Sequence, residues 1–455
     1  MVLDRKAGSG AATFRRGTGL ACLFLLAGCM EAGLSPLVTK LGFNPAAKAE
    51  GSAVMGLPGG LPGDSLDPQK AVASSLIADL QARQSLLPVG GAYAAVADAV
   101  IEASSGAAAA ELRLARLQAA AEATNWLPQI GPSVSLTSLS GLVASLLIEQ
   151  ALLDNGRRKA ERAYAAADVE VAAVGLSADI NQRVFEGLSF YIDAARARDQ
   201  AAIAERAMGR LAEFDRIMGQ RVTGGLSDRS EQQLVSQRAA EMRATAAGDR
   251  QAETTALAEL AMLTGRGISI GGLDVMPLLS AVTEPLSLLK ARGQAARMIA
   301  AAKVQHAGLL PGVIGSIGID ADGINPGIRI GTNGLFGLGT GARLQALEAT
   351  AEVADRQIAE AAQDAQRRRV ALERDIVSLQ SRQTQGSEVL RQTVGNLDLF
   401  TQQYKVGRRT LIELVGQFDS TARLERDQAT LNYEIALKQL ELARDAGALV
   451  DGARM

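Results

Sequence analysis

The sequence predicts a mainly α-helical protein that contributes four β-strands to a transmembrane β-barrel. Ala, Leu, Gln, Glu and Arg dominate its 455 residues and aromatic residues make up only 3%, which favours long helices with narrow seams. The segment 342–405 carries apolar residues in steps of three and four. A strand-like stretch, LPQIGPSVSLT from Leu127, has a counterpart in LPGVIGSIGID from Leu310. These three observations define the expected fold class.

The N-terminus predicts a lipoprotein signal peptide over residues 1–28. Basic residues precede an apolar run at 17–27, and the run ends in LAGC, Leu26 to Cys29. This order is that of a bacterial secretory signal, and the run is too short to span a bilayer. LAGC resembles a lipobox, so we expect lipid on Cys29; an ordinary signal peptide with an incidental cysteine is the alternative. The Gly- and Pro-rich chain that follows reads as a lipidated linker, 29–90.

The rest of the chain predicts an internal two-fold repeat, 91–283 and 284–455. The second Leu-Pro stretch lies 183 positions after the first, and the same displacement carries Gly156 onto Gly339. Conserved order and spacing over so long a unit favour duplication.

Each copy is expected to hold a short helix, a strand pair, a long helix and a further helix. In the first copy these cover 106–125, 130–139 with 144–151, 157–219 and 226–264. In the second copy they cover 286–307, 313–320 with 327–332, 342–405 and 411–449. Two more short helices are expected within 68–105. The long helices, at about 1.5 Å per residue, are too long for a globular domain, so each is expected to run antiparallel to its two shorter helices.

The second long helix shows a heptad seam, which predicts coiled-coil packing. Arg368 and Gln383 occupy seam positions, so looser or hydrated contacts are expected there. The apolar seam residues are Leu344, Leu347, Ala351, Ala354, Ile358, Ala361, Ala365, Leu372, Ile376, Leu379, Leu390, Leu397 and Tyr404.

The strands alternate apolar and polar residues, as transmembrane barrel strands do. In 313–320, Val313, Ile317 and Ile319 share one face. An ordinary soluble hairpin would alternate in the same way, and 144–151 does not reveal its faces. Four strands cannot close a barrel in a bilayer, because open edges are excluded from hydrocarbon and about eight strands is the smallest spanning barrel. If the strands enter a membrane, several chains must share one barrel.

These features resemble the TolC family of outer-membrane efflux ducts, particularly its lipidated members. The motifs are LAGC, NWLPQIGPSVSLT, LLDNGRRKAERAYAAADVEVA and FTQQYKVGRRTLIELVGQFDSTARLERDQATLNYEIALKQLELARDAG, with coverage from about 92 to 450. The resemblance implies a homotrimer with a twelve-stranded barrel in the outer membrane and an antiparallel α-helical coiled-coil barrel in the periplasm. It implies a passive duct that exports drugs or metals, docked on a periplasmic adaptor and an inner-membrane pump of RND or ABC type.

The resemblance also implies a periplasmic gate. The family's YxxGxR turn falls on Tyr404, Gly407 and Arg409, and a ring carboxylate falls on Glu413. In the first copy the gate's aspartate falls on Asp228, after a turn at Gly224. A seam residue and a solvated helix face are the alternative interpretations of Tyr404 and Glu413.

Other function classes find little support. The chain has no phosphate loop, nucleophile elbow or metal-ligand cluster, so we expect no enzyme activity, cofactor or bound metal. A net charge of -2 gives no electrostatic reason to expect nucleic-acid binding. Two alternatives remain: an outer-membrane duct for one-step (type I) protein secretion, and a lipid-anchored periplasmic coiled-coil scaffold that never spans the membrane.

Overall fold

The computed structural model describes residues 74–138, 141–276, 283–320, 323–332 and 337–454. The predicted signal peptide and Cys29 lie outside these residues, as does the part of the predicted linker before residue 74. All the described residues belong to the unit that begins at Leu66.

The first half of the described chain contains five helices and two strands. Two short helices come first, α1 (Ser75–Ala82) and α2 (Ala92–Glu102), followed by α3 (Ala107–Ala123). Strands β1 (Gln129–Ser138) and β2 (Gly141–Leu153) lead into the long helix α4 (Arg157–Thr223) and then α5 (Arg229–Thr264).

The second half repeats this order of elements. Helix α6 (Leu286–Gly308) precedes strands β3 (Gly312–Asp320) and β4 (Gly323–Gly331). The long helix α7 (Thr340–Lys405) and α8 (Leu411–Asp445) follow, and a short 3-10 helix, η3 (Gly452–Arg454), comes last. The matching order agrees with the predicted repeat, while a duplication stays a prediction.

The predicted element types are confirmed, with ends that shift by a few residues. The largest differences are four residues: α4 ends after the predicted 219, α8 ends before the predicted 449, and β4 begins before the predicted 327. Strand β2 begins three residues before the predicted 144. Gly141 and Gly323 start these strands, and glycine at a strand start gives no period-2 signal. The two short helices expected within 68–105 are α1 and α2; α1 packs on α4 although its sequence lies in the predicted linker.

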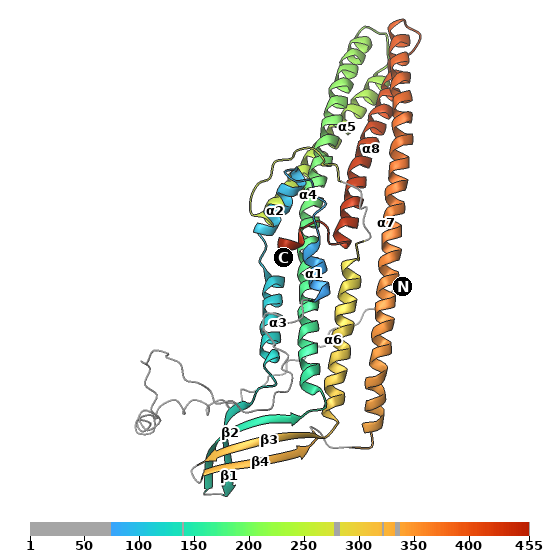
Figure 1. The fold of residues 1–455 in the computed structure, drawn as a ribbon. Coiled ribbons are helices and arrows are strands. Elements are labelled where there is room, and N and C mark those ends of the chain that lie inside the picture. The colour runs from blue at the N-terminus through green and yellow to red at the C-terminus, as the bar shows by residue number, and fades with distance from the viewer. Residues whose placement is uncertain (1–73, 139–140, 277–282, 321–322, 333–336, 455) are drawn as a thin grey trace, which may run out of the picture. The chain divides into compact units, whose positions relative to one another are not determined.

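All four strands form one antiparallel sheet in the order β1-β2-β3-β4. The central pairing joins the two halves of the chain, because β2 pairs with β3 from Leu146↔Ile319 to Leu153↔Val313. The sheet lies at one end of the helices, and the α4–α5 and α7–α8 turns lie at the other (Figure 1). This arrangement puts both strand pairs at one end, as predicted from the helix lengths.

The two long helices occupy different environments. Helix α4 packs against α1, α2, α3, α5, α6 and α8, whereas α7 packs against α6 and α8. Along α4, buried residues recur from Ala160 to Met218. Helix α7 buries four residues, Ala354, Leu372, Ile376 and Leu379. One long helix is therefore central in the protomer and the other lies at its flank.

The largest core cluster surrounds Tyr93, Leu188 and Tyr191, where α2, α4 and the end of α8 meet. The rings of Tyr93 and Tyr191 pack edge to face with centroids 6.0 Å apart. The Tyr191 hydroxyl accepts a hydrogen bond from Gly271 N at 2.8 Å and donates one to Gly272 O at 3.2 Å. This hydroxyl thereby fastens the segment after α5 onto α4. Across the described residues, no helix has the length and apolarity needed to cross a bilayer.

Candidate functional site: the sheet faces and the helix tips

The strand register brings most of the apolar residues of all four strands onto one side of the sheet. Ile130 pairs with Ile148, Ile148 with Ile317, and Ile317 with Pro326. Because side chains alternate along each strand, this alignment fixes the whole face. We call this surface the apolar face; its members are Ile130, Pro132, Val134, Ala144, Leu146, Ile148, Val313, Gly315, Ile317, Ile319, Ile324, Pro326, Ile328 and Ile330.

The apolar face is exposed in the protomer. Ile324, Ile328 and Ile330 are each at least 70% exposed, and Ile130 is 67% exposed. A polar residue, Gln150, shares this face beside the helices, and its Nε2 donates to Trp126 O at 2.7 Å. Contiguous exposed apolar surface of this kind marks a membrane or protein contact. The register also answers the question that the sequence of 144–151 left open, since Leu146 and Ile148 join the apolar face.

The opposite side of the sheet, which we call the polar face, carries small and charged residues. Its apolar members Leu147 and Ile314 are half-buried. Asn325 Nδ2 donates to Asp320 Oδ2 at 2.9 Å near the β3–β4 turn. At the end nearer the helices, Arg329 lies 3.6 Å from Glu149. The remaining members are Gln129, Gly131, Ser133, Ser145, Ser316, Gly318 and Gly327.

At the other end of the helices, the α7–α8 turn is held by a capping box. Thr410 Oγ1 accepts from Glu413 N at 3.3 Å, and Glu413 Oε2 accepts from Thr410 N at 2.9 Å. This reciprocal pair satisfies two backbone N–H groups, those of Thr410 and Glu413, at the start of α8. The Thr410 N–H, followed by the Arg409 guanidinium, lowers the pKa of the Glu413 carboxyl below its usual value.

Arg409 has three partners, contributed by the end of α7 and the first turn of α8. Its Nη1 donates to Glu413 Oε1 and its Nε to Gln403 Oε1, each at 3.0 Å. The guanidinium carbon lies 4.6 Å from the centre of the Phe400 ring, a cation–π distance. Sequence reasoning missed Phe400 and Gln403, because a turn gives no periodic signal that pairs residues six and nine positions apart.

The predicted gate residues form two separate groups within one protomer. Tyr404 is half-buried and packs, with Phe400, on the core cluster near the tips. Gly407 adopts a left-handed φ of 76° that favours glycine. Asp228 is exposed at the N-cap of α5, and its side chain makes no capping hydrogen bond.

The α4–α5 turn, in the first half of the chain, differs from the prediction in one detail. Gly224 is the C-cap of α4 with φ -79°, and the left-handed conformation belongs to the next residue, Gly225, with φ 71°. The turn is also fastened more sparsely, by Arg221 Nε donating to Ser227 Oγ at 3.1 Å.

No protein-family model and no curated protein matches this sequence. Solved structures do match. The outer membrane protein VceC from Vibrio cholerae superposes with a TM-score of 0.68 at 18% identity, over 78% of this chain and 96% of that one. The chain has the fold of the outer-membrane channels. The Campylobacter jejuni CmeC outer membrane channel gives 0.65 at 10% identity, over 83% and 86% of the two chains.

A channel in its open state also shows this fold. The Neisseria gonorrhoeae MtrE outer membrane channel matches with a TM-score of 0.59 at 16% identity, over 84% of this chain and 90% of that one. The matched residues cover 86% to 96% of the length of the three solved chains. The resemblance read from the sequence is confirmed at the level of the fold.

Within this channel fold, the seam of α7 is confirmed and its polar positions are corrected. All apolar seam residues are buried or half-buried except Ala351. Gln383 donates to Asn432 of α8, and Arg368 bridges to Glu441 at 3.0 Å and Asp445 at 2.6 Å. The expected loose contacts are therefore specific polar contacts between α7 and α8.

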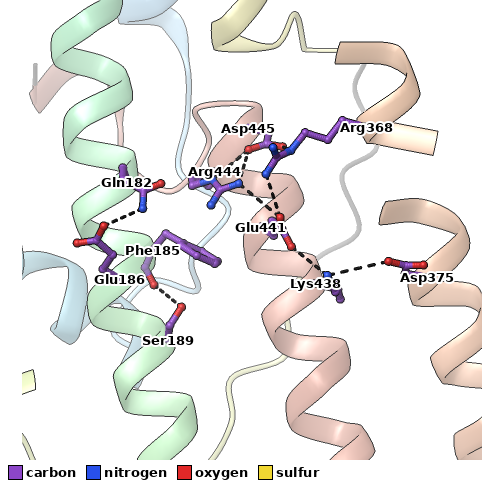
Figure 2. A network of polar contacts seen from close by, with 10 residues as sticks. All are labelled: Gln182, Phe185, Glu186, Ser189, Arg368, Asp375, Lys438, Glu441, Arg444 and Asp445. Atoms are coloured by element: carbon purple, nitrogen blue, oxygen red, sulfur yellow. Dashed lines mark hydrogen bonds and ion pairs between the residues drawn. The ribbon is translucent and has the colours of Figure 1, made fainter. Parts of the chain in front are cut away.

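Figure 2 shows that Arg368 belongs to a larger network at the end of α8. Arg444 contacts Asp445 at 2.7 Å, and Lys438 contacts Glu441 at 3.2 Å. The Arg444 guanidinium carbon also lies 4.5 Å from the centre of the Phe185 ring on α4. Isolated surface ion pairs contribute little, but this network ties the flanking helix α7 to α8 and, through Phe185, to α4.

Proposed function

We propose that this protein is the outer-membrane channel of a tripartite efflux pump, a passive duct that carries small molecules such as drugs or metals out of the periplasm. The channel fold supports this proposal, as do the sequence motifs that resemble the TolC family. Because the proposed duct is a passive conduit, selectivity for the exported molecule would reside mainly in the pump.

One observation carries the proposal: a four-stranded sheet with one exposed apolar face and two strands, β1 and β4, at its edges. In hydrocarbon, each unpaired backbone group costs several kcal/mol, so spanning sheets close into barrels. About eight strands is the minimum for a spanning barrel. Three copies would supply twelve strands and pair every edge, so we propose a homotrimer.

The flank of α7 supports assembly with further copies. Away from its seam, α7 exposes apolar residues such as Val377 and Leu399, which are 64% and 54% exposed. A neighbouring protomer would cover this flank and complete a ring of helices below the barrel. The scaffold alternative gives no reason for the apolar face of the sheet.

The remaining parts of the proposal concern anchoring and partners. Lipid on Cys29 would tether the chain to the outer membrane, since each buried CH₂ contributes about 0.8 kcal/mol. The helix tips would face a periplasmic adaptor and an inner-membrane pump of RND or ABC type. Tyr404, Arg409, Glu413 and Asp228 would line the periplasmic mouth and gate it.

The test uses the full-length protein purified in detergent. We expect unheated samples to migrate as trimers on gels and heated samples as monomers, and reconstituted protein to give unitary conductance in planar bilayers. A folded monomer that stays in solution without detergent and gives no conductance would contradict the proposal.

A deletion strain separates efflux from protein secretion. We expect loss of the gene to raise the intracellular level of a fluorescent pump substrate and to lower resistance to drugs or metals. Unchanged accumulation together with loss of a secreted protein from the medium would favour the one-step secretion duct.

A further inference from the structure

The polar face of the sheet changes character along the strands. Toward the β3–β4 turn it carries the Asp320–Asn325 contact, and further along it carries mostly Gly and Ser. Toward the helices, Arg329 stands between Gly327 and Gly331 on the same side of β4. A long cationic side chain flanked by two glycines projects above its surroundings, and the Arg329 side chain is 68% exposed.

Glu149 is the ionic partner of Arg329 across an intervening strand. Glu149 pairs in register with Ser316 of β3, and Ser316 pairs with Gly327 of β4. The short serine leaves room above β3, so that Arg329 reaches Glu149 at 3.6 Å. The Glu149 side chain is 31% exposed. The two charges therefore compensate each other while both remain accessible from the polar side.

This pair borders a polar cavity where the sheet meets α3, α4 and α6. The cavity is also lined by Arg157 and Glu161, which pair with each other at 2.8 Å. Asp154 is used at the start of α4, where its carboxylate accepts from Gly156 N and Arg158 N at 3.1 and 2.9 Å. Among the described strand residues at this end of the polar face, Glu149 and Arg329 are thus the charged pair.

We propose that Glu149 and Arg329 form a charge-balanced pair that keeps the conduit free of net charge where the barrel joins the helices, so that either residue alone would make the conduit ion-selective. The inference rests on the proposed function, in which the polar face lines the lumen and three copies place three such pairs in one ring. With both charges present the ring is balanced. If one member is removed, three like charges remain, and at about 0.1 M salt their influence extends about 10 Å into the lumen.

Planar-bilayer recordings across a tenfold KCl gradient test this inference. We expect Arg329→Gln to raise the ratio of potassium to chloride permeability by about threefold or more, because three carboxylates then attract cations. Glu149→Gln is expected to shift the ratio in the opposite direction. The double variant and the exchanged pair, Glu149→Arg with Arg329→Glu, are expected to keep the wild-type reversal potential.

A cysteine variant removes the concern that a changed pair disturbs assembly. The sequence contains two cysteines, Cys22 and Cys29, and both precede the described residues. The described residues thus contain no native thiol that competes with Arg329→Cys. A charged methanethiosulfonate reagent can then be added to modify this cysteine after the channel is conducting. A cationic reagent is expected to restore the wild-type reversal potential during the recording, and an anionic reagent to increase cation selectivity. Ile328→Cys, on the apolar face, is the matched control and is expected not to respond.

The outcomes distinguish this inference from the proposed function. If wild-type protein conducts and every variant keeps the wild-type reversal potential, the inference is wrong and the channel proposal stands. If wild-type protein gives no conductance, the proposed function and the inference both fall.

Discussion

At the residue scale, Arg409 shows how a predicted gate residue is actually held. Within one protomer it is engaged by Gln403, Glu413 and the Phe400 ring. An arginine fixed by a fork of hydrogen bonds and an aromatic face is preorganised. The turn that carries it is consequently a firm structure, whereas the exposed Asp228 turn is fastened more sparsely.

Loosening the α7–α8 turn should open the channel. We expect Tyr404→Phe with Arg409→Ser to raise single-channel conductance, because the double change removes the turn's cation–π and ionic contacts and the tyrosine hydroxyl. Arg408→Ser is the matched control, since Arg408 is the exposed neighbour. Equal conductance of wild type and the double variant would exclude these residues as the latch.

Glu413 makes the same turn sensitive to acid. Its folded pKa lies below the usual value, so its stabilising effect is complete above the unfolded pKa of about 4.3 and is lost as the pH falls through the folded pKa. We expect amide exchange in residues 406–414, corrected for the intrinsic effect of pH, to be slower in wild type than in Glu413→Gln at pH 7. The difference should shrink as the pH falls and the Glu413 carboxyl becomes protonated; a difference that stays constant as the pH falls would contradict this account.

At the element scale, the pairing register of the strands decides which side chains share a face of the sheet. Alternation within β3 was legible in the sequence, but β2 contains the run Leu146–Leu147–Ile148, which offers apolar residues to both faces. Pairing with Ile319, Gly318 and Ile317 decides which of them face the apolar side. A shift of one residue would exchange the two faces.

The two sides of the sheet should therefore respond differently to charge. We expect Ile328→Lys to destabilise the membrane-inserted protein by about 2–4 kcal/mol if the residue lies near the bilayer midplane. Ser316→Lys on the polar face should be tolerated beside Glu149. The temperature at which unheated oligomers dissociate on gels measures both variants, and an equal loss in the two would refute the assignment of faces.

At the scale of the whole molecule, the two long helices play unequal parts despite their similar position in the two halves of the chain. Helix α4 is surrounded by α1, α2, α3, α5, α6 and α8, whereas α7 is held along one seam by α6 and α8. The network of Arg368, Glu441 and Asp445 fixes that seam near its middle. This asymmetry leaves a long flank for contact with another copy.

Two leucine truncations separate folding of the protomer from assembly. Leu188 is fully buried in the largest core cluster, so Leu188→Ala should cost about 2–5 kcal/mol of protomer stability. Leu399→Ala should leave the denaturant midpoint of the protomer nearly unchanged and lower the dissociation temperature of the oligomer. If Leu399→Ala affects neither quantity, that part of α7 is not an interface.

Helix and strand positions could be predicted from the sequence because they depend on local periodicity. The seam of α7 and the alternation of β3 repeat at fixed intervals, and both are visible in a single sequence. The errors fall where the signal is weak, as at Gly141 and Gly323, or where adjacent glycines are equivalent by type, as at Gly224 and Gly225.

Local patterns in the sequence were enough to predict which segments are helix or strand, their order in the two halves, and the candidate turn residues. The three-dimensional contacts were needed to show which faces of the strands unite, which long helix is central, and that partners engage Arg409 and Arg368. The reason is physical: period and propensity act between near neighbours along the chain. Register, central position and ion pairing instead depend on contacts between residues far apart in sequence, such as Glu149 with Arg329 and Arg368 with Asp445.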